Sequence, residues 1–509
     1  MNSLHPFQSG IVEECMKKGS GGLALPMGSG KTLVSLCVAL RQCSADEKIL
    51  IVASKSLIQS WKHELEKFFS DVPIAIALLT ETLCVKDAKV VLTTPSTLVK
   101  FYKSQELFDS VVQRPAEFGG ANTYIRVKAP LGTGIFFGCR WGVLIVDEVH
   151  KYTNFTTITC RSILALCVRN RWLLSGTIMP EATPSRIFGF HLLLNEKSMP
   201  RNYPQAKRYI SKRYTGLVHL LVIRYSNDMF VNRPKITTRV VKHALTENER
   251  AIYTIFQELS VDLTASLNDA VENGNRNDAA LIRIEMSLII CHLRIFIVAP
   301  MVALSRIFLA VSDGTHSQDS SVHKIYNMLK GIGMASFMDD VKSLKTSRIS
   351  SILDTVNTTS NRTVVFSAFR LNLKYLEMFL EHRQVIVIYS SDSSDERGAK
   401  VKLFNESEKA ILLLTYAIGS DGLNLQGGET VLLLDVWWNK STSEQAVARV
   451  YRFGQSSDVT VYTFFSNTGI ERGMLHKHAD KSFVSEEILT GPPKSSVRTM
   501  KVEDVIKLF

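Results

Sequence analysis

Two short motifs, each directly after a run of apolar residues, constrain the fold of this chain most. The first is Gly28-Ser29-Gly30-Lys31-Thr32, which follows the apolar run Gly22 to Leu25 and precedes a segment with helical periodicity. A glycine-rich turn at the start of a helix directs backbone N–H groups toward a phosphate, and the helix dipole adds to the attraction. The pattern therefore predicts a buried strand, a phosphate-binding loop over residues 26–30 and a helix beginning at Lys31.

The second motif is Asp147-Glu148-Val149-His150, which follows the continuous apolar run Val143 to Val146. Such a run is typical of a strand buried on both faces, and α/β proteins bind ligands at the carboxyl ends of these strands. An acidic pair at a strand end is often only a solvated cap, and a glycine-rich turn before a helix is common. Both motifs in this order, each behind its own buried strand, favour hydrolysis of a nucleoside triphosphate.

The chemistry of the motif residues suggests how they would act. Lys31 is suited to reach the β/γ-phosphates, and the Thr32 hydroxyl is suited to hold Mg²⁺. Glu148 is the natural base for the attacking water. We therefore expect an ATPase that uses Mg²⁺.

Length and composition indicate a globular protein with about three or four domains of ordinary size. The chain has 509 residues, of which 45% are hydrophobic and 21% charged, and a net charge of +12. The positive charge favours a polyanionic partner or an anionic surface, although a diffuse positive surface also promotes solubility. The eight cysteines include no C-x-x-C pair, as in buried thiols of a reducing compartment.

No targeting or membrane segment is expected. The N-terminal residues have no signal-peptide pattern. The most apolar stretch, Met286 to Val311, is interrupted by His292, Arg294, Pro300 and Arg306, so buried helices are expected there and not a membrane span.

Apolar runs alternate with helical patterns in two separate parts of the chain, as a parallel sheet with crossover helices requires. Between them, from about Glu247 to Leu344, helical periodicity dominates. We expect two α/β lobes, residues 1–240 and 346–490, joined by a helical segment (241–345) and followed by a tail (491–509). The further expected strands are Ile49 to Val52, Val90 to Thr93, Trp172 to Ser175, Thr363 to Phe366, Val385 to Ile388, Ile411 to Leu414, Val431 to Leu434 and Val459 to Tyr462. Gln113 to Leu131 is expected to be an inserted loop, and Val502 to Phe509 a short amphipathic helix.

The second lobe contains a candidate complement to the phosphate site. Ser443 to Gly454 is expected to be a helix that presents Gln445, Arg449 and Arg452 on one face, because they are spaced i, i+4 and i+7. Two arginines from a separate lobe can neutralise the charge that develops on a γ-phosphate. On spacing alone, a solvated basic face is the competing interpretation.

Several of these segments resemble the motifs of superfamily 2 proteins of the Snf2-like group. Gln445 to Gln455 resembles the last helicase motif, and Trp141 to His150 and Trp438-Asn439 resemble others. The resemblance implies an ATP-dependent helicase or translocase with two RecA-like parallel-sheet lobes and ATP bound between them. It extends through His5 to Gln8, Ser54 to Trp61, Thr93 to Pro95, Leu293-Arg294, Phe366-Ser367, Arg397 and Gly419 to Leu425.

The resemblance also implies residue roles. Catalysis would fall to Lys31, Asp147, Glu148, Arg449 and Arg452, with Mg²⁺ held by Thr32 and Asp147. Coupling would involve His150, Ser175, Thr177 and Gln445. Nucleic acid would be gripped, mainly through its backbone, by Ser54, Thr94, Thr97, Ser367, Asn424 and Trp438, although strand-end capping is an equally good interpretation of such hydroxyls. ATP would further contact Gln8, which would read adenine, and Pro26, Met27, Gly28, Ser29, Gly30 and Gly422.

Within the group, the chain resembles a virus-encoded member. This implies a protein of the virion and of viral factories in the host cytoplasm, with viral transcription machinery as a partner. Three function classes stay open: an RNA helicase or remodelling ATPase in viral transcription, a duplex-DNA translocase without strand separation, and a non-catalytic scaffold. The intact Lys31, Asp147, Glu148 and both arginines argue against the scaffold. Phosphate contacts do not distinguish RNA from DNA.

The interval from Leu425 to Gln445 bears on strand separation. Processive superfamily 2 helicases commonly insert a β-hairpin wedge there, and such a hairpin needs about ten residues beyond the core fold. Those residues are not present, although a wedge could come from residues 113–131 or from the helical segment. We therefore expect movement along nucleic acid and displacement of obstacles in preference to melting of long duplexes.

Overall fold

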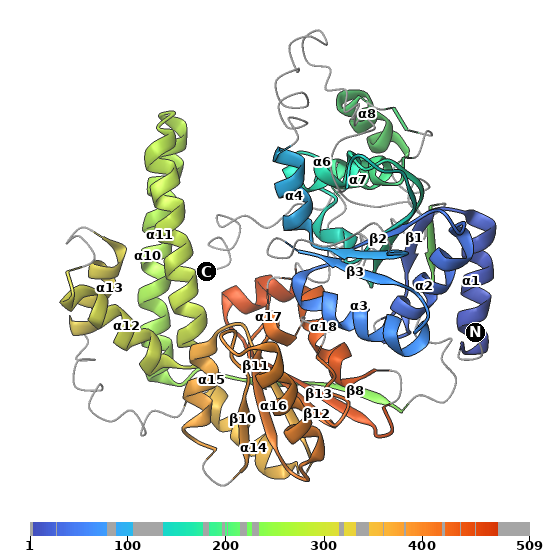
Figure 1. Ribbon diagram of the computed structural model, residues 1–509. Helices are drawn as coiled ribbons and strands as arrows, with labels where there is room; N and C mark the ends of the chain where they lie inside the picture. Colours follow the sequence, from blue (N-terminus) through green and yellow to red (C-terminus); the bar gives the residue numbers. More distant parts are fainter. Residues whose placement is uncertain are drawn as a thin grey trace. The chain divides into compact units, whose positions relative to one another are not determined.

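The computed structural model describes most of the chain, and its residues form two compact units that divide near residue 233. Helix and strand labels are those of Figure 1. The described residues are 4–26, 28–78, 88–104, 136–176, 183–195, 199–200, 202–213, 221–225, 234–314, 320–331, 346–359, 361–380, 383–419, 423–437, 439–452 and 455–476.

The first unit is built on a seven-stranded parallel sheet with the strand order β3-β4-β2-β5-β6-β1-β7. Its two central motif strands, β1 and β5, both pair with β6, so the phosphate-loop strand and the acidic-motif strand are separated by one strand only. The strands are β1 (Gly21–Ala24), β2 (Ile49–Val52), β3 (Ile74–Ala77), β4 (Val90–Thr93), β5 (Trp141–Val146), β6 (Val168–Ser175) and β7 (Val222–Arg224).

Helices cover both faces of this sheet, because its strands are apolar on both sides. In β2, Ile49 and Ile51 face the core beneath α1–α3, and Leu50 and Val52 face the core beneath α4 and α6–α8. The helices are α1 (Pro6–Lys18), α2 (Lys31–Gln42), α3 (Lys55–Phe68), α4 (Pro95–Ser104), α6 (Ile158–Leu164), α7 (Pro184–Leu193) and α8 (Tyr203–Arg213), with the short helix η1 (Val149–Lys151) after β5.

The second unit is built on a six-stranded parallel sheet with the order β10-β11-β9-β12-β13-β8. Alternate residues again enter two cores: Val364 and Phe366 face α16–α18, and Val365 faces α14 and α15. The strands are β8 (Ile236–His243), β9 (Thr363–Ser367), β10 (Val385–Val387), β11 (Ile411–Thr415), β12 (Thr430–Leu433) and β13 (Val459–Ser466). Their helices are α14 (Ser347–Thr358), α15 (Arg370–Glu377), α16 (Ser394–Glu406), α17 (Tyr416–Gly419) and α18 (Lys440–Val450).

The helical segment shares the hydrophobic core of the second unit. Leu293 and Leu304 belong to the same buried cluster as Val365 and Leu432 of the sheet. Figure 1 shows α10 and α11 side by side as a long hairpin. The segment consists of α10 (Glu247–Glu272), α11 (Arg276–Phe296), α12 (Pro300–Ser312) and α13 (Ser321–Gly331). No helix in the described ranges is both long and apolar enough to cross a bilayer.

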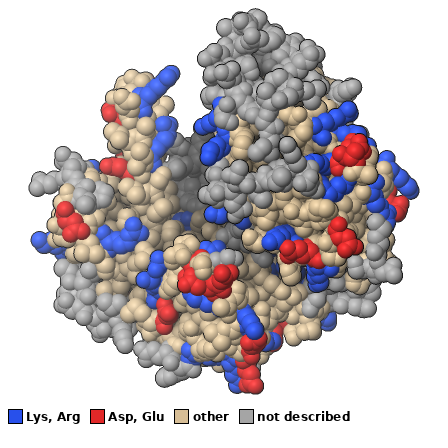
Figure 2. All heavy atoms as spheres, in the orientation of Figure 1, with Lys and Arg blue, Asp and Glu red and all other residues tan. Residues whose placement is uncertain are grey.

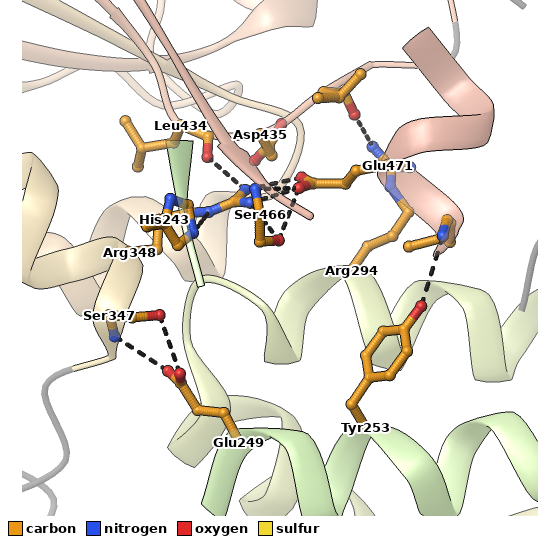
Figure 3. A network of polar contacts seen from close by, with 12 residues as sticks. His243, Glu249, Tyr253, Arg294, Ser347, Arg348, Leu434, Asp435, Ser466 and Glu471 are labelled. Carbon is orange, nitrogen blue, oxygen red and sulfur yellow. Dashed lines mark hydrogen bonds and ion pairs between the residues drawn. The ribbon is translucent and has the colours of Figure 1, made fainter. Parts of the chain in front are cut away.

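A buried arginine forms hydrogen bonds that hold several elements together at the β8 edge of the second sheet (Figure 3). Arg348 of α14 is fully buried and uses all five of its N–H donors. The Glu471 carboxylate accepts two of these bonds, at 2.9 and 2.6 Å. The remaining three go to His243 Nε2 (3.0 Å), the Leu434 carbonyl (3.0 Å) and the Ser466 hydroxyl (2.8 Å). The network therefore joins α14 to β8, β13 and the end of β12.

The expected strands are all present, with ends shifted by a few residues. The structure adds β3, β7 and β8, which the sequence pattern did not indicate. β8 differs most, since it extends across the expected boundary at residue 240 and pairs with β13 of the second sheet. Its side chains are largely exposed, so it lacks the apolar run of a buried strand. The expected loop at 113–131 and the tail helix lie outside the described residues.

Candidate nucleotide-binding site

The loop between β1 and α2 has the backbone of a phosphate-binding turn. Gly28 and Gly30 have φ values of 73° and 82°, in the left-handed region that glycine adopts without strain. The Ser29 N–H donates to the Pro26 carbonyl at 3.2 Å, which closes the turn. Helix α2 begins at Lys31, and Gly30 at its N-cap offers no side-chain cap. The N-terminus of α2, where an anion would bind, therefore has no side chain of its own N-cap residue across it.

Gln8 holds this loop from α1. Its side-chain oxygen accepts from the His5 N–H, and its Nε2 donates to the Ser29 carbonyl, both at 3.0 Å. A Cβ atom on Gly30 would lie 2.4 Å from Gln8 Nε2, so the close approach requires glycine. The structure thus places Gln8 beside the loop in a supporting role, and adenine recognition by Gln8 stays a prediction.

Asp147 lies at the carboxyl end of β5, where two hydrogen bonds fix its carboxylate. Trp61 Nε1 donates to Oδ2 at 3.0 Å, and the Glu148 N–H donates to Oδ1 at 2.9 Å. Burial raises the pKa of Asp147, and the neighbouring Glu148 raises it further. The positive charge of Lys31 and the Trp61 hydrogen bond act in the opposite direction. Lys31 is therefore close enough to lower the pKa of Asp147 through its charge, and a shared phosphate and metal site requires such proximity.

Glu148 has a backbone conformation that is unusual for its residue type. Its φ and ψ are 48° and 46°, which costs about 1–3 kcal/mol for a residue other than glycine and often marks a functional site. Its buried Oε2 has no hydrogen-bond partner among the described residues. Burial alone would raise the pKa of Glu148, but the contact with His150 and the charges of Lys31 and Lys151 outweigh it and lower the pKa. The carboxylate is therefore ionised near neutral pH, and His150 Nδ1 lies 3.3 Å from its Oε2.

His150 connects the acidic motif to the end of β6. Its Nδ1 lies 3.3 Å from Glu148 Oε2 and 2.9 Å from the Ser175 hydroxyl. Both His150 and Ser175 are buried. The structure thus brings together two residues that the resemblance assigns to coupling, and it places one of them, His150, against the expected base. Thr177 and Met27 lie outside the described residues.

In the second unit, the helix expected over Ser443 to Gly454 has different bounds in the structure. α18 starts earlier, at Lys440, because the Asn439 side chain accepts from the Ser441 N–H at 3.1 Å. It ends at Val450, so Arg452 follows the helix and does not share a helical face with Gln445 and Arg449. Arg449 Nε donates to the Gly419 carbonyl at 3.2 Å. Gln445 is buried, and its Nε2 has no hydrogen-bond partner among the described residues.

Three of the six expected nucleic-acid contacts have internal side-chain partners in the structure. Thr94 and Thr97 are buried and hydrogen-bonded to each other at 2.8 Å, at the start of α4. Ser367 is fully buried and donates to the Asp435 carboxylate. Ser54 is the N-cap residue of α3, and Asn424 is exposed. Trp438 lies outside the described residues, as does Gly422 of the expected ATP contacts. Contact with nucleic acid stays a prediction for the six residues Ser54, Thr94, Thr97, Ser367, Asn424 and Trp438.

Two supporting residues could not be found from the sequence. Trp61 ends a segment that resembles a family motif, but nothing in its spacing connects it to Asp147, 86 residues away. Arg186 of α7 donates to the His150 carbonyl at 3.0 Å, and it lies in a segment without any recognisable pattern. Both contacts are made by tertiary packing.

The loop after β1 and the acidic pair after β5, on one parallel sheet, define the class of P-loop nucleotide-binding proteins. The chain matches the SNF2-related domain over residues 11–292, more than half of its length, and the helicase conserved C-terminal domain over residues 345–454. The chain belongs to the SNF2-related family.

Relatives of this family are similar along nearly the whole chain. The DNA excision repair protein CSB of Oryza sativa is 23% identical over 97% of this chain and 41% of its own length. The ISWI chromatin-remodeling complex ATPase ISW2 of Saccharomyces cerevisiae is 25% identical over 97% of this chain and 41% of its own length. A viral protein named as a helicase, 172L of Invertebrate iridescent virus 6, is 23% identical over 98% of this chain and 93% of its own length.

The chain thus spans less than half the length of the two cellular relatives. A solved structure, the Sulfolobus solfataricus SWI2/SNF2 ATPase core in complex with dsDNA, aligns with 96% of this chain and 93% of its own at 19% identity and a TM-score of 0.39. The fold described above is defined by the strand order of each sheet and does not depend on that alignment.

Proposed function

We propose that this protein hydrolyses ATP with Mg²⁺ and uses the energy to move along nucleic acid. The observation that carries the proposal is the arrangement of residues at the carboxyl ends of two inner strands of the first sheet. There the phosphate loop, Lys31 and the pair Asp147–Glu148 follow strands β1 and β5, which are both neighbours of β6.

The residues present fit ATP and Mg²⁺. The loop has two left-handed glycines, a glycine without a side-chain cap at the N-cap of α2 and a buried Ser29 hydroxyl without a partner among the described residues. Thr32 and Asp147 would hold Mg²⁺, since one or two protein oxygens plus phosphates and waters are its usual ligands. Each oxygen of Asp147 accepts one hydrogen bond and keeps a lone pair. When bound, Mg²⁺ neutralises charge on the phosphates.

Each side chain has a proposed role in hydrolysis. Lys31 binds the terminal phosphates, and the ionised carboxylate of Glu148 accepts a proton from the attacking water. His150 orients Glu148 and links it to Ser175. The roles of Arg449 and Arg452, which stabilise the charge that develops on the γ-phosphate, are supported by family membership.

Duplex DNA is the track that the relatives favour, because they are named for DNA excision repair and chromatin remodelling. The net charge of +12 suits binding through phosphates. On the face drawn in Figure 2, Lys and Arg side chains are spread over several places and interleaved with Asp and Glu, which fits backbone binding better than base reading.

Translocation without extensive melting is supported by the interval from Leu425 to Gln445. All its residues except 438 are described, and they contain β12 and the start of α18 with no further strand. ATP hydrolysis should be measured with RNA, single-stranded DNA and duplex DNA, and strand melting compared with displacement of a third strand. Hydrolysis independent of nucleic acid, or efficient melting of long duplexes by the purified protein, would contradict the proposal.

A role in viral transcription, with RNA as the track, is the second candidate. It is supported by the similarity to the iridescent virus protein, which this chain matches over 93% of its length. Packaging in virions and action in the host cytoplasm belong to the same candidate. Immunoblots of purified virions and stronger ATPase stimulation by RNA than by duplex DNA would support it, and absence from virions would count against it.

A further inference from the structure

Helix α7 packs against the segment that follows the acidic motif and η1. The packing is so close that position 189 of the helix requires glycine. A Cβ atom on Gly189 would lie 1.8 Å from the Thr153 carbonyl oxygen and 3.3 Å from the Phe155 nitrogen. Thr153 is 1% exposed, and the rings of Phe155 and Phe188 meet edge to face at 5.1 Å. The segment after η1 therefore cannot shift without moving α7.

Arg186 lies one turn before Gly189 on the same helix, and it binds the turn directly. Its Nη1 donates to the His150 carbonyl at 3.0 Å and lies 3.5 Å from the Thr153 hydroxyl. The Thr153 hydroxyl also points to the His150 carbonyl, at 3.4 Å. The backbone of His150 is therefore held from α7 and from its own turn.

The anchored backbone limits where the His150 ring can lie, and two side chains contact the ring. The ring is between Glu148 and Ser175, with Nδ1 at 3.3 Å from the carboxylate and 2.9 Å from the hydroxyl. Glu148 itself has the left-handed backbone conformation, which persists only where its surroundings enforce it. His150 is one of the residues in contact with Glu148 that can help to enforce it.

We propose that Arg186 is a positioning residue for hydrolysis: it holds the His150 backbone so that the imidazole keeps Glu148 in place for the attacking water. The inference rests on the proposed ATPase function and assigns this task to a residue outside the motifs.

The test compares Arg186→Met, which keeps the aliphatic stem, with Arg186→Lys, which keeps a charged donor. Arg208→Ala is the matched control, since Arg208 is an exposed arginine of α8. A 1 Å displacement near a reacting group can cost about 10²-fold, so Arg186→Met should lower kcat by about 5- to 100-fold. The KM for ATP should change less than about two-fold, Arg186→Lys should regain much of kcat, and the control should match the parent.

A double-mutant cycle separates positioning from simple loss of structure. If Arg186 acts through His150, adding Arg186→Met to a His150→Ala protein should change kcat by less than about two-fold. Additive losses in the cycle, an unchanged kcat in Arg186→Met, or equal losses in Arg186→Met and Arg186→Lys would overturn the inference. A parent protein without nucleic-acid-stimulated ATPase activity would refute the proposed function and this inference together. An active parent with a fully active Arg186→Met variant would refute the inference alone.

Discussion

The indole Nε1 of Trp61 donates a 3.0 Å hydrogen bond to Oδ2 of Asp147, although 86 residues separate them. Trp61 is 2% exposed and packs in the core beneath α1–α3, so its ring cannot turn away from the carboxylate. The expected metal ligand is thus oriented by a residue of the hydrophobic core.

Trp61→Phe should weaken Mg²⁺ binding by about ten-fold, because outer hydrogen bonds to metal ligands typically contribute that much. It also removes one of the contacts that lower the pKa of Asp147, so this pKa should rise. The acidic limb of the kcat/KM profile should therefore move to higher pH. The measurement is ATPase activity over a Mg²⁺ titration and a pH series, with Trp172→Phe as a buried tryptophan control. An unchanged Mg²⁺ requirement would show that this bond does not orient the ligand.

Lys31→Ala should reduce kcat by about 10²–10³-fold or more, because it removes the cation expected at the terminal phosphates. Glu148→Gln keeps the size of the side chain and removes the base, so it should bind ATP normally and lose about 10²–10⁴-fold in kcat. Nucleotide binding and single-turnover hydrolysis distinguish the two variants. Hydrolysis by Glu148→Gln at the parental rate would require a different base.

Arg449→Ala and Arg452→Ala should each lower kcat far more than they weaken ATP binding. An arginine that stabilises the transition state contributes about 10³–10⁵ in rate. Lys402→Ala is a suitable control, since this exposed lysine belongs to α16 of the same unit. Equal effects on kcat and on nucleotide affinity would indicate ground-state binding instead.

Stability of the second unit should fall on acidification between about pH 6.5 and pH 4. Burial and the charge of Arg348 lower the pKa of His243 to about 4, so the unfolded state binds a proton in this window and the folded state does not. Burial opposes ionisation of Glu471, but Arg348 holds its pKa below the usual value, which adds a loss of stability at lower pH. In chemical denaturation, the free energy of unfolding should depend less on pH for His243→Gln than for the parent protein. A parent protein equally stable at pH 6.5 and pH 4.5 would contradict this reasoning.

Nucleic-acid affinity should fall steeply with salt and depend little on base sequence. A protein that neutralises six or more phosphates loses roughly 10³-fold in affinity between about 50 and 200 mM salt. Fluorescence anisotropy with unrelated duplexes of equal length would measure both effects. A strong preference for one sequence at physiological salt would indicate base reading.

The sequence predicted the two parallel sheets because their strands are apolar on both faces, as in Ile49–Val52 and Ile411–Thr415. It also placed Lys31, Asp147 and Glu148, because glycines before a helix and carboxylates after a strand are local signals. It did not predict β8, whose side chains are mostly exposed. Nor could it show that Thr94, Thr97 and Ser367 turn inward, since a hydroxyl that caps a helix and one that binds phosphate have the same sequence signature.

The place of β8 in the second sheet has a consequence for biosynthesis. Its described partner is β13 alone, which begins at Val459, so β8 leaves the ribosome long before it can pair. At about 5–20 residues per second, the delay is on the order of 10–40 s. The seven described strands of the first unit have been made by then, whereas the second sheet cannot be completed until its last strand arrives. A ribosome that pauses before Val459 would therefore present an unpaired edge to chaperones.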